Sequence, residues 1–279
     1  MKKKTLFITI TIVLVFIFLY LITLIFLKKD MQTSKNIIEG LYNSGQISYH
    51  YKTPSMFYEY EKAFNTVLLS LMMFVPPIVV LVPGLYNIFK ILKSGYIKYI
   101  VNTRKQYRKF IRNEIFNCYK YALIIPIIYL IVVLGCGILT NFSLELSQNG
   151  LDANYYDISF NNPYILILMT FINLFLADLF YINVGLISAS RIKNFLVNII
   201  FSYLIITIIG ISSELIGIVL SSYTKNDLFA NIGSFYNLWR PQDSGNILFV
   251  SVFLLILCSI SFVIVVRIYK NEEEVVNGI

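Results

Sequence analysis

The sequence is poor in charged residues and in the side chains that usually bind metals or carry out catalysis. Only 14% of its 279 residues are charged, 57% are hydrophobic, and the single histidine is His50. The three cysteines, Cys118, Cys136 and Cys258, show neither metal-ligand spacing nor a disulfide framework. The G-x-x-x-x-G-K-[ST] loop that cradles ATP phosphates is also missing. We therefore expect no metal site, no ATP site and no other cofactor on this chain.

Long uncharged runs are what the sequence has in abundance. A helix needs roughly 20 apolar residues to span a bilayer. Six segments meet this requirement, at about 5–27, 63–89, 121–142, 164–190, 195–220 and 245–266. They leave no room for a sizeable soluble domain. The first is longer than the roughly 7–15 apolar residues of a signal peptide, so we expect it to be a retained helix. The sequence predicts an all-α, polytopic membrane protein with six transmembrane helices, forming a single domain over 1–279.

The distribution of lysine and arginine predicts the orientation of these helices. If the N-terminus is cytoplasmic, the inner connecting segments hold sixteen of the 23 basic residues and the outer segments hold seven. Positive charge is retained on the cytoplasmic side of membrane proteins. We therefore expect both termini to be cytoplasmic, and we attribute most of the net charge of +8 to topology rather than to nucleic-acid binding.

The segment 90–120 is the most basic part of the chain and links the second and third predicted spans. Ser94-Gly95 is expected to end one helix, and Asn102 and Thr103 are good N-cap residues for another. Beyond them, apolar residues recur at helical spacing between basic ones: Tyr107, Phe110, Ile111, Ile115 and Phe116. This pattern predicts an amphipathic helix on the inner membrane surface that runs directly into the third span.

The sequence KSGYIKYIVNTRKQYRKFIRNEIFNCYKYALIIPII resembles the helix 2–helix 3 junction of ABC-2 type permeases, the membrane subunits of one class of ATP-binding-cassette transporters. The resemblance is specific over about 94–128, and a lysine expected just before the third span is replaced by Asn113-Glu114. The matching positions are Ser94, Gly95, Tyr96, Ile97, Lys98, Tyr99, Ile100, Thr103, Arg104 and Tyr107.

This resemblance implies a permease without chemistry of its own. ATP and Mg²⁺ would bind a separate ATPase subunit, and two permease subunits would pair as a homodimer or heterodimer in a bacterial cytoplasmic membrane. The segment 90–120 would act as the coupling segment, with Tyr99, Thr103, Arg104 and Arg108 contacting the ATPase. The substrate would be hydrophobic or amphipathic, such as a drug, a peptide or a lipid-like compound, and would be exported. Its identity and the direction of transport do not follow from these residues.

Two acidic residues interrupt the predicted spans. Asp178 is either part of a substrate pathway or proton relay, or it forms an inter-helix hydrogen bond or reaches the basic inner segment. Glu214 follows Asn194 by 20 residues and is expected near the outer boundary, in an outer turn or a short re-entrant piece, or simply as a hydrated interfacial acid. Pro76-Pro77 predicts a kink in the second span.

Other functions are compatible with the sequence. A membrane immunity or sensor protein without transport activity would have the same pattern. A membrane-embedded enzyme would need ionisable groups that converge at one depth. Asp178 and Glu214 are expected near opposite sides of the membrane, so an enzyme is the less favoured reading. The outer loop 28–62 is rich in tyrosine, which an interfacial aromatic belt or a contact with a partner or an exported molecule would explain.

Overall fold

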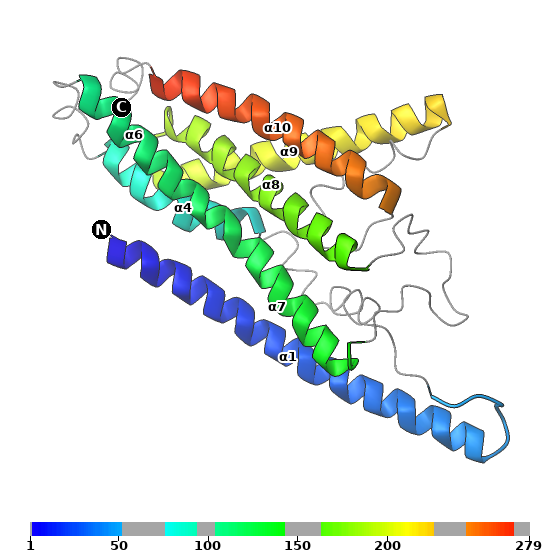
Figure 1. Ribbon diagram of the computed structural model, residues 1–279. Coiled ribbons are helices and arrows are strands. Elements are labelled where there is room, and N and C mark those ends of the chain that lie inside the picture. Colours follow the sequence, from blue (N-terminus) through cyan, green and yellow to red (C-terminus); the bar gives the residue numbers. More distant parts are fainter. Residues whose placement is uncertain (1, 52–75, 94–103, 143–162, 226–243, 271–279) are drawn as a thin grey trace.

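The computed structural model describes residues 2–51, 76–93, 104–142, 163–225 and 244–270 (Figure 1). Every regular element in these ranges is a helix, which confirms the predicted all-α class. In chain order they are α1 (Lys2–Asn43), α4 (Pro76–Lys93), α6 (Arg104–Tyr119), the 3₁₀ helix η2 (Lys120–Leu123), α7 (Ile124–Leu139), α8 (Pro163–Ala189), α9 (Phe195–Thr224) and α10 (Ser244–Lys270).

Within the described ranges, four helices are long and apolar enough to cross a membrane. They run over Tyr107–Leu139, Tyr164–Ala189, Phe195–Thr224 and Ile247–Lys270. These helices cover the last four of the predicted spans. The first predicted span, 5–27, lies within α1, and the first part of the second, 63–75, lies outside the described residues. The chain is therefore a helical membrane protein.

Helix α8 is at the centre of the bundle. It packs against α10, α4, α9 and α7, so its neighbours surround it. The starts of α1, α6 and α9 and the ends of α4, α8 and α10 lie at the same end of the bundle, on the left of Figure 1. The helices therefore alternate in direction as consecutive membrane spans do.

A glycine allows α8 to approach α4 closely. A Cβ atom added at Gly185 would overlap the side chain of Leu85 and would lie 2.7 Å from Cδ2 of Leu81. On the facing helix, a Cβ atom at Gly84 would make only ordinary contacts, 3.6 Å from Ile182. Gly185 is thus the position where the packing of these two helices requires the absence of a side chain.

The first helix is longer than predicted, because residues 28–43, expected to belong to a loop over 28–62, continue it, while 52–62 lie outside the described residues. Helix α1 continues as far as Asn43. The residues after 27 are polar but contain no proline, and Lys35 and Glu39 form an exposed ion pair one turn apart at 3.8 Å. The helix ends at Gly45, whose positive φ of 74° and N–H bond to the Tyr42 carbonyl form a glycine C-cap.

The prediction of an outer turn or a short re-entrant piece around Glu214 is also wrong. Helix α9 runs without interruption from Phe195 to Thr224, with Glu214 exposed about two thirds of the way along it. The neighbouring Ser213 does not break the helix because its hydroxyl donates to the Ile209 carbonyl one turn back, at 2.7 Å. The helix ends instead at Lys225, which adopts the left-handed conformation.

Candidate functional site

Helix α6 has one buried face and one basic face. Tyr107, Ile111 and Ile115 are buried at intervals of four residues, whereas Arg108 and Arg112 are exposed. This alternation confirms the predicted amphipathic helix and its direct continuation into the third span. Its apolar face packs against α4 and α8, however, and is therefore not available to the lipid interface.

The combined helix Tyr107–Leu139 is too long to lie wholly within a bilayer. Its 33 residues extend over about 50 Å at 1.5 Å per residue, against a hydrocarbon core of about 30 Å. Because the apolar residues are concentrated in α7, the basic α6 is the part that protrudes. Phe116, which the sequence pattern placed on the apolar face, is 65% exposed.

The predicted coupling residues are only partly described by the structure. Arg108 is exposed on α6, and Arg104 is the first residue of that helix. Tyr99 and Thr103 lie outside the described residues. Asn102 and Thr103, the predicted N-cap residues, also lie outside the described residues, and the described part of α6 begins at Arg104.

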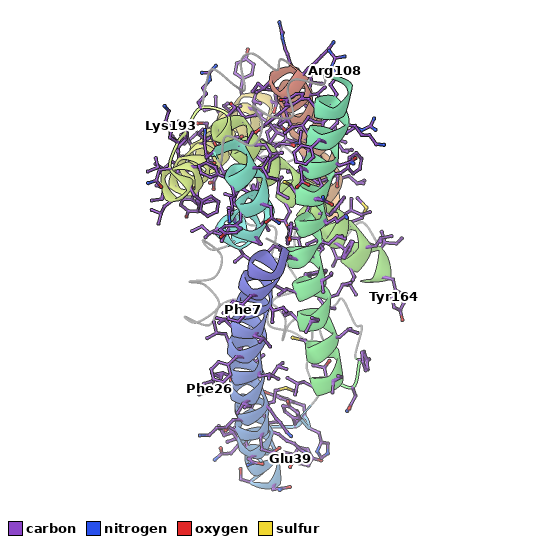
Figure 2. The ribbon with its side chains drawn as sticks, turned by 90° about the vertical axis from the view of Figure 1, so that its left-hand side faces the viewer. Phe7, Phe26, Glu39, Arg108, Tyr164 and Lys193 are labelled. Atoms are coloured by element: carbon purple, nitrogen blue, oxygen red, sulfur yellow. The ribbon has the colours of Figure 1, made fainter. Side chains whose placement is uncertain are left out.

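Exposed basic side chains gather at the end of the bundle where α6 begins. We call this the basic end. Figure 2 places Arg108 of α6 and Lys193 of the α8–α9 connection at this end, well away from Phe26 and Glu39 of α1. The exposed basic residues of α4, α6 and the α8–α9 connection are Lys90, Arg108, Lys109, Arg112, Arg191 and Lys193. On these described segments the only carboxylate is Glu114. The basic end is thus suited to a partner that carries negative charge.

The buried polar side chains of α8 connect it to its neighbours, and sequence reasoning did not single them out. Ser251 of α10 donates to Oδ1 of Asn173 at 2.6 Å, and Nδ2 of Asn173 donates to the Ile247 carbonyl at 3.3 Å. Near the basic end, the hydroxyl oxygens of Ser188 and Ser202 lie 2.6 Å apart and join α8 to α9. The rarity of amides and hydroxyls within apolar spans is the signal that would have pointed to them.

Asn183 connects three elements at once. Its Oδ1 accepts from the Tyr119 hydroxyl of α6 at 2.6 Å, and its Nδ2 donates to Oγ of Ser261 in α10 at 3.0 Å. Near the basic end, the Tyr269 hydroxyl of α10 donates to the Leu186 carbonyl at 2.9 Å. Helices α6, α8 and α10 are therefore joined by hydrogen bonds that cross the apolar core.

Asp178 is buried, with 1% of its surface exposed, and its carboxyl group lies beside the backbone N–H of Ile125. Ile125 lies just after η2, where the Ile124 N–H bonds to the Tyr121 carbonyl three residues back and Pro126 has no N–H. Asp178 thus faces the first turn of α7 from another helix. Its Oδ2 has no hydrogen-bond partner among the described residues. This geometry favours the inter-helix hydrogen bond among the interpretations open from the sequence.

Asp178 and Glu214 differ in their surroundings. Asp178 is buried between α8 and α7, whereas Glu214 is exposed on α9. Comparison of the chain with family models, with curated proteins and with solved structures finds no match.

Proposed function

We propose that this chain is the membrane-spanning permease subunit of an ABC-2 type transporter, driven by ATP hydrolysis on a separate ATPase subunit. The observation that carries the proposal is the basic helix α6, which continues a membrane-spanning helix beyond the apolar region. This geometry agrees with the resemblance of residues 94–128 to the coupling region of such permeases. The substrate would be hydrophobic or amphipathic, and export is the proposed direction.

The faces of α6 support a docking role. The side that holds Tyr107 and Ile111 is anchored on α4, while Arg108, Lys109 and Arg112 are exposed at the basic end. A force applied to the exposed side would be passed to α4 and α7, because α6 is packed on the first and continuous with the second. Coupling of an ATPase to membrane helices requires such a connection.

The full topology is part of the proposal. It comprises six transmembrane helices, cytoplasmic termini and a bacterial cytoplasmic membrane, with two permease subunits in the complex. The placement of the ends of α1, α4, α6, α8 and α10 supports it, because a cytoplasmic basic end would put the start of α1 and the end of α10 inside. The coupling residues would be Tyr99, Thr103, Arg104 and Arg108.

Affinity purification from native membranes in mild detergent tests the proposal. We expect the wild-type chain to co-purify with an ATPase, and the double variant Arg108→Glu, Arg112→Glu to lose at least about 90% of it because both charges at the docking surface are reversed. Both side chains are exposed, so the free energy of unfolding should change by about 0.5 kcal/mol or less per residue.

The matched control is Lys28→Glu, Lys29→Glu, which reverses two exposed charges on α1. This control should retain the ATPase, since α1 carries no part of the proposed docking surface. A wild-type chain that purifies without any ATPase would contradict the permease assignment and favour an immunity or sensor protein.

A further inference from the structure

Aromatic packing brings the end of α4 against the start of α9. The ring of Phe195, the first residue of α9, lies 5.7 Å from that of Tyr86 and 5.3 Å from that of Phe89, in edge-to-face arrangements. Such contacts fix the two helix ends relative to each other. They place the last turn of α4, which carries Lys93, beside the α8–α9 connection, which carries Lys193.

Lys93 is a cation without a counter-charge among the described residues. Its Nζ is buried and has no hydrogen-bond partner there, and its closest compensation is the ring of Phe89, whose centroid is 5.6 Å away. Burial, together with the charge of nearby Lys193, lowers the pKa of Lys93. A buried ammonium group needs an anion, and a cation–π contact replaces only part of that interaction.

The described part of the chain does not supply this anion. Its one ion pair is Lys35–Glu39 on α1. The N-terminus of α9 is not a competing attraction for an anion, because Oδ1 of Asn194 already accepts from the backbone N–H groups of Leu196 and Val197. The two lysines, rather than the end of the helix, are therefore the groups positioned to bind an anion.

An apolar surface begins directly beside the two lysines. Leu196, Val197, Ile200 and Phe201 are all exposed on the first two turns of α9, immediately after Lys193. A phospholipid has a charged headgroup and apolar chains. A pair of cations followed along the helix by exposed apolar side chains is complementary to both parts of such a lipid. Lys193 lies at the basic end, as a headgroup contact at the membrane surface requires (Figure 2).

We propose that Lys93 and Lys193 bind the phosphate of an anionic lipid headgroup, with the acyl chains lying along the exposed apolar side of α9. This inference does not depend on the proposed transport function. It requires only that the chain is inserted in a membrane, so it stands or falls separately from the co-purification with an ATPase.

Lipid titration of the full-length protein in detergent tests the site. Phosphatidylglycerol is added, and binding is followed by native mass spectrometry and by the increase in Tm. We expect saturable binding of phosphatidylglycerol and weaker binding of phosphatidylcholine. The variant Lys93→Gln, Lys193→Gln should raise the Kd for phosphatidylglycerol about tenfold or more, because it removes both headgroup cations.

Two control variants separate this site from general attraction. Lys90→Gln, Arg191→Gln removes two exposed charges of the same end and should leave the Kd within about twofold. Lys93→Arg, Lys193→Arg keeps both charges and should retain binding. If the double glutamine variant does not fold, Lys193→Gln alone, at an exposed position, should raise the Kd about fivefold.

Three results would overturn the proposal. An equal loss of binding in Lys90→Gln, Arg191→Gln would show diffuse attraction rather than a site. Equal binding of phosphatidylcholine would remove the requirement for a net negative headgroup. Displacement of phosphatidylglycerol by an excess of inorganic phosphate, with an equal increase in Tm from phosphate alone, would assign the site to a soluble anion.

Discussion

The Tyr119 hydroxyl donates a 2.6 Å hydrogen bond to Oδ1 of Asn183, and this contact joins the end of the basic helix α6 to the central helix α8. The same amide donates to Ser261, so both of its polar ends have partners. An amide satisfied on both sides inside an apolar core fixes the relative rotation of the three helices that it touches. A displacement of α6 is therefore expected to carry α8 and α10 with it.

Removing the Tyr119 hydroxyl tests this connection. The variant Tyr119→Phe should lower the free energy of unfolding by about 1 kcal/mol, because Oδ1 of Asn183 loses its donor in an apolar setting. Unfolding in mixed micelles measures the change. Tyr223→Phe, at a side chain 88% exposed on α9, is the matched control and should have no effect. Equal stability of the two variants would show that the hydrogen bond does not matter.

The close approach of α8 and α4 predicts opposite effects for two glycine substitutions. Gly185→Ala should destabilise the protein by about 1–3 kcal/mol, because the new Cβ overlaps the fully buried side chain of Leu85, which must then repack. Gly84→Ala meets only ordinary contacts and should be neutral or stabilise by up to about 1 kcal/mol. Thermal unfolding of both variants in one detergent gives the comparison, and a stable Gly185→Ala protein would contradict this helix packing.

Two substitutions of Asp178 separate its structural role from a role that needs the charge. Asp178→Asn keeps an oxygen acceptor for the Ile125 N–H and should fold with nearly unchanged stability. Asp178→Leu removes the polar group that faces the Ile125 N–H and should cost about 1 kcal/mol, the usual net contribution of one hydrogen-bonding group. If Asp178→Asn abolishes function while its Tm is unchanged, the charge itself is required and the role is not only structural.

The buried ammonium group of Lys93 predicts a pH dependence in lipid-free detergent. Its pKa in the folded protein is lowered below the ordinary 10.5, so the buried charge destabilises the fold at neutral pH. As pH rises, the folded state loses this proton before the unfolded state does, and the destabilisation decreases. Lys93→Met should therefore raise Tm at pH 7.5, and its advantage over the wild type should shrink as pH approaches 10.5.

Lys90→Met, at an exposed position of the same helix, provides the reference for this measurement. Because the Lys90 side chain is exposed, its removal should raise Tm much less than Lys93→Met does. An advantage of Lys93→Met that is the same at both pH values would indicate a packing effect and not a charge effect.

Much of the helical architecture could be predicted from the distribution of charge along the sequence. The predicted spans 164–190 and 245–266 correspond to α8 and α10 because uncharged runs in a membrane protein are bounded by the residues that must reach water. The buried face of α6 followed from its periodicity.

The errors and omissions have a common physical origin. Polar residues were read as the end of a helix after residue 27 and around Glu214, although a serine or an exposed ion pair is compatible with helical backbone. The contacts of Tyr119 with Asn183, and of Lys93 with Phe89, join helices far apart in sequence or depend on burial. Local periodicity contains no information about which faces of distant helices meet, so these contacts required the structure.

The position of η2 within the long helix has a mechanical consequence. Lys120–Leu123 lies near the middle of Tyr107–Leu139, with about 20 Å of helix before it and about 24 Å after it. The long helix thus has two arms of nearly equal length on either side of η2. A tilt of about 10° about that point would move the two tips roughly 4 Å in opposite directions. A force that displaces the basic end of this helix would therefore displace its other end by a similar distance in the opposite direction.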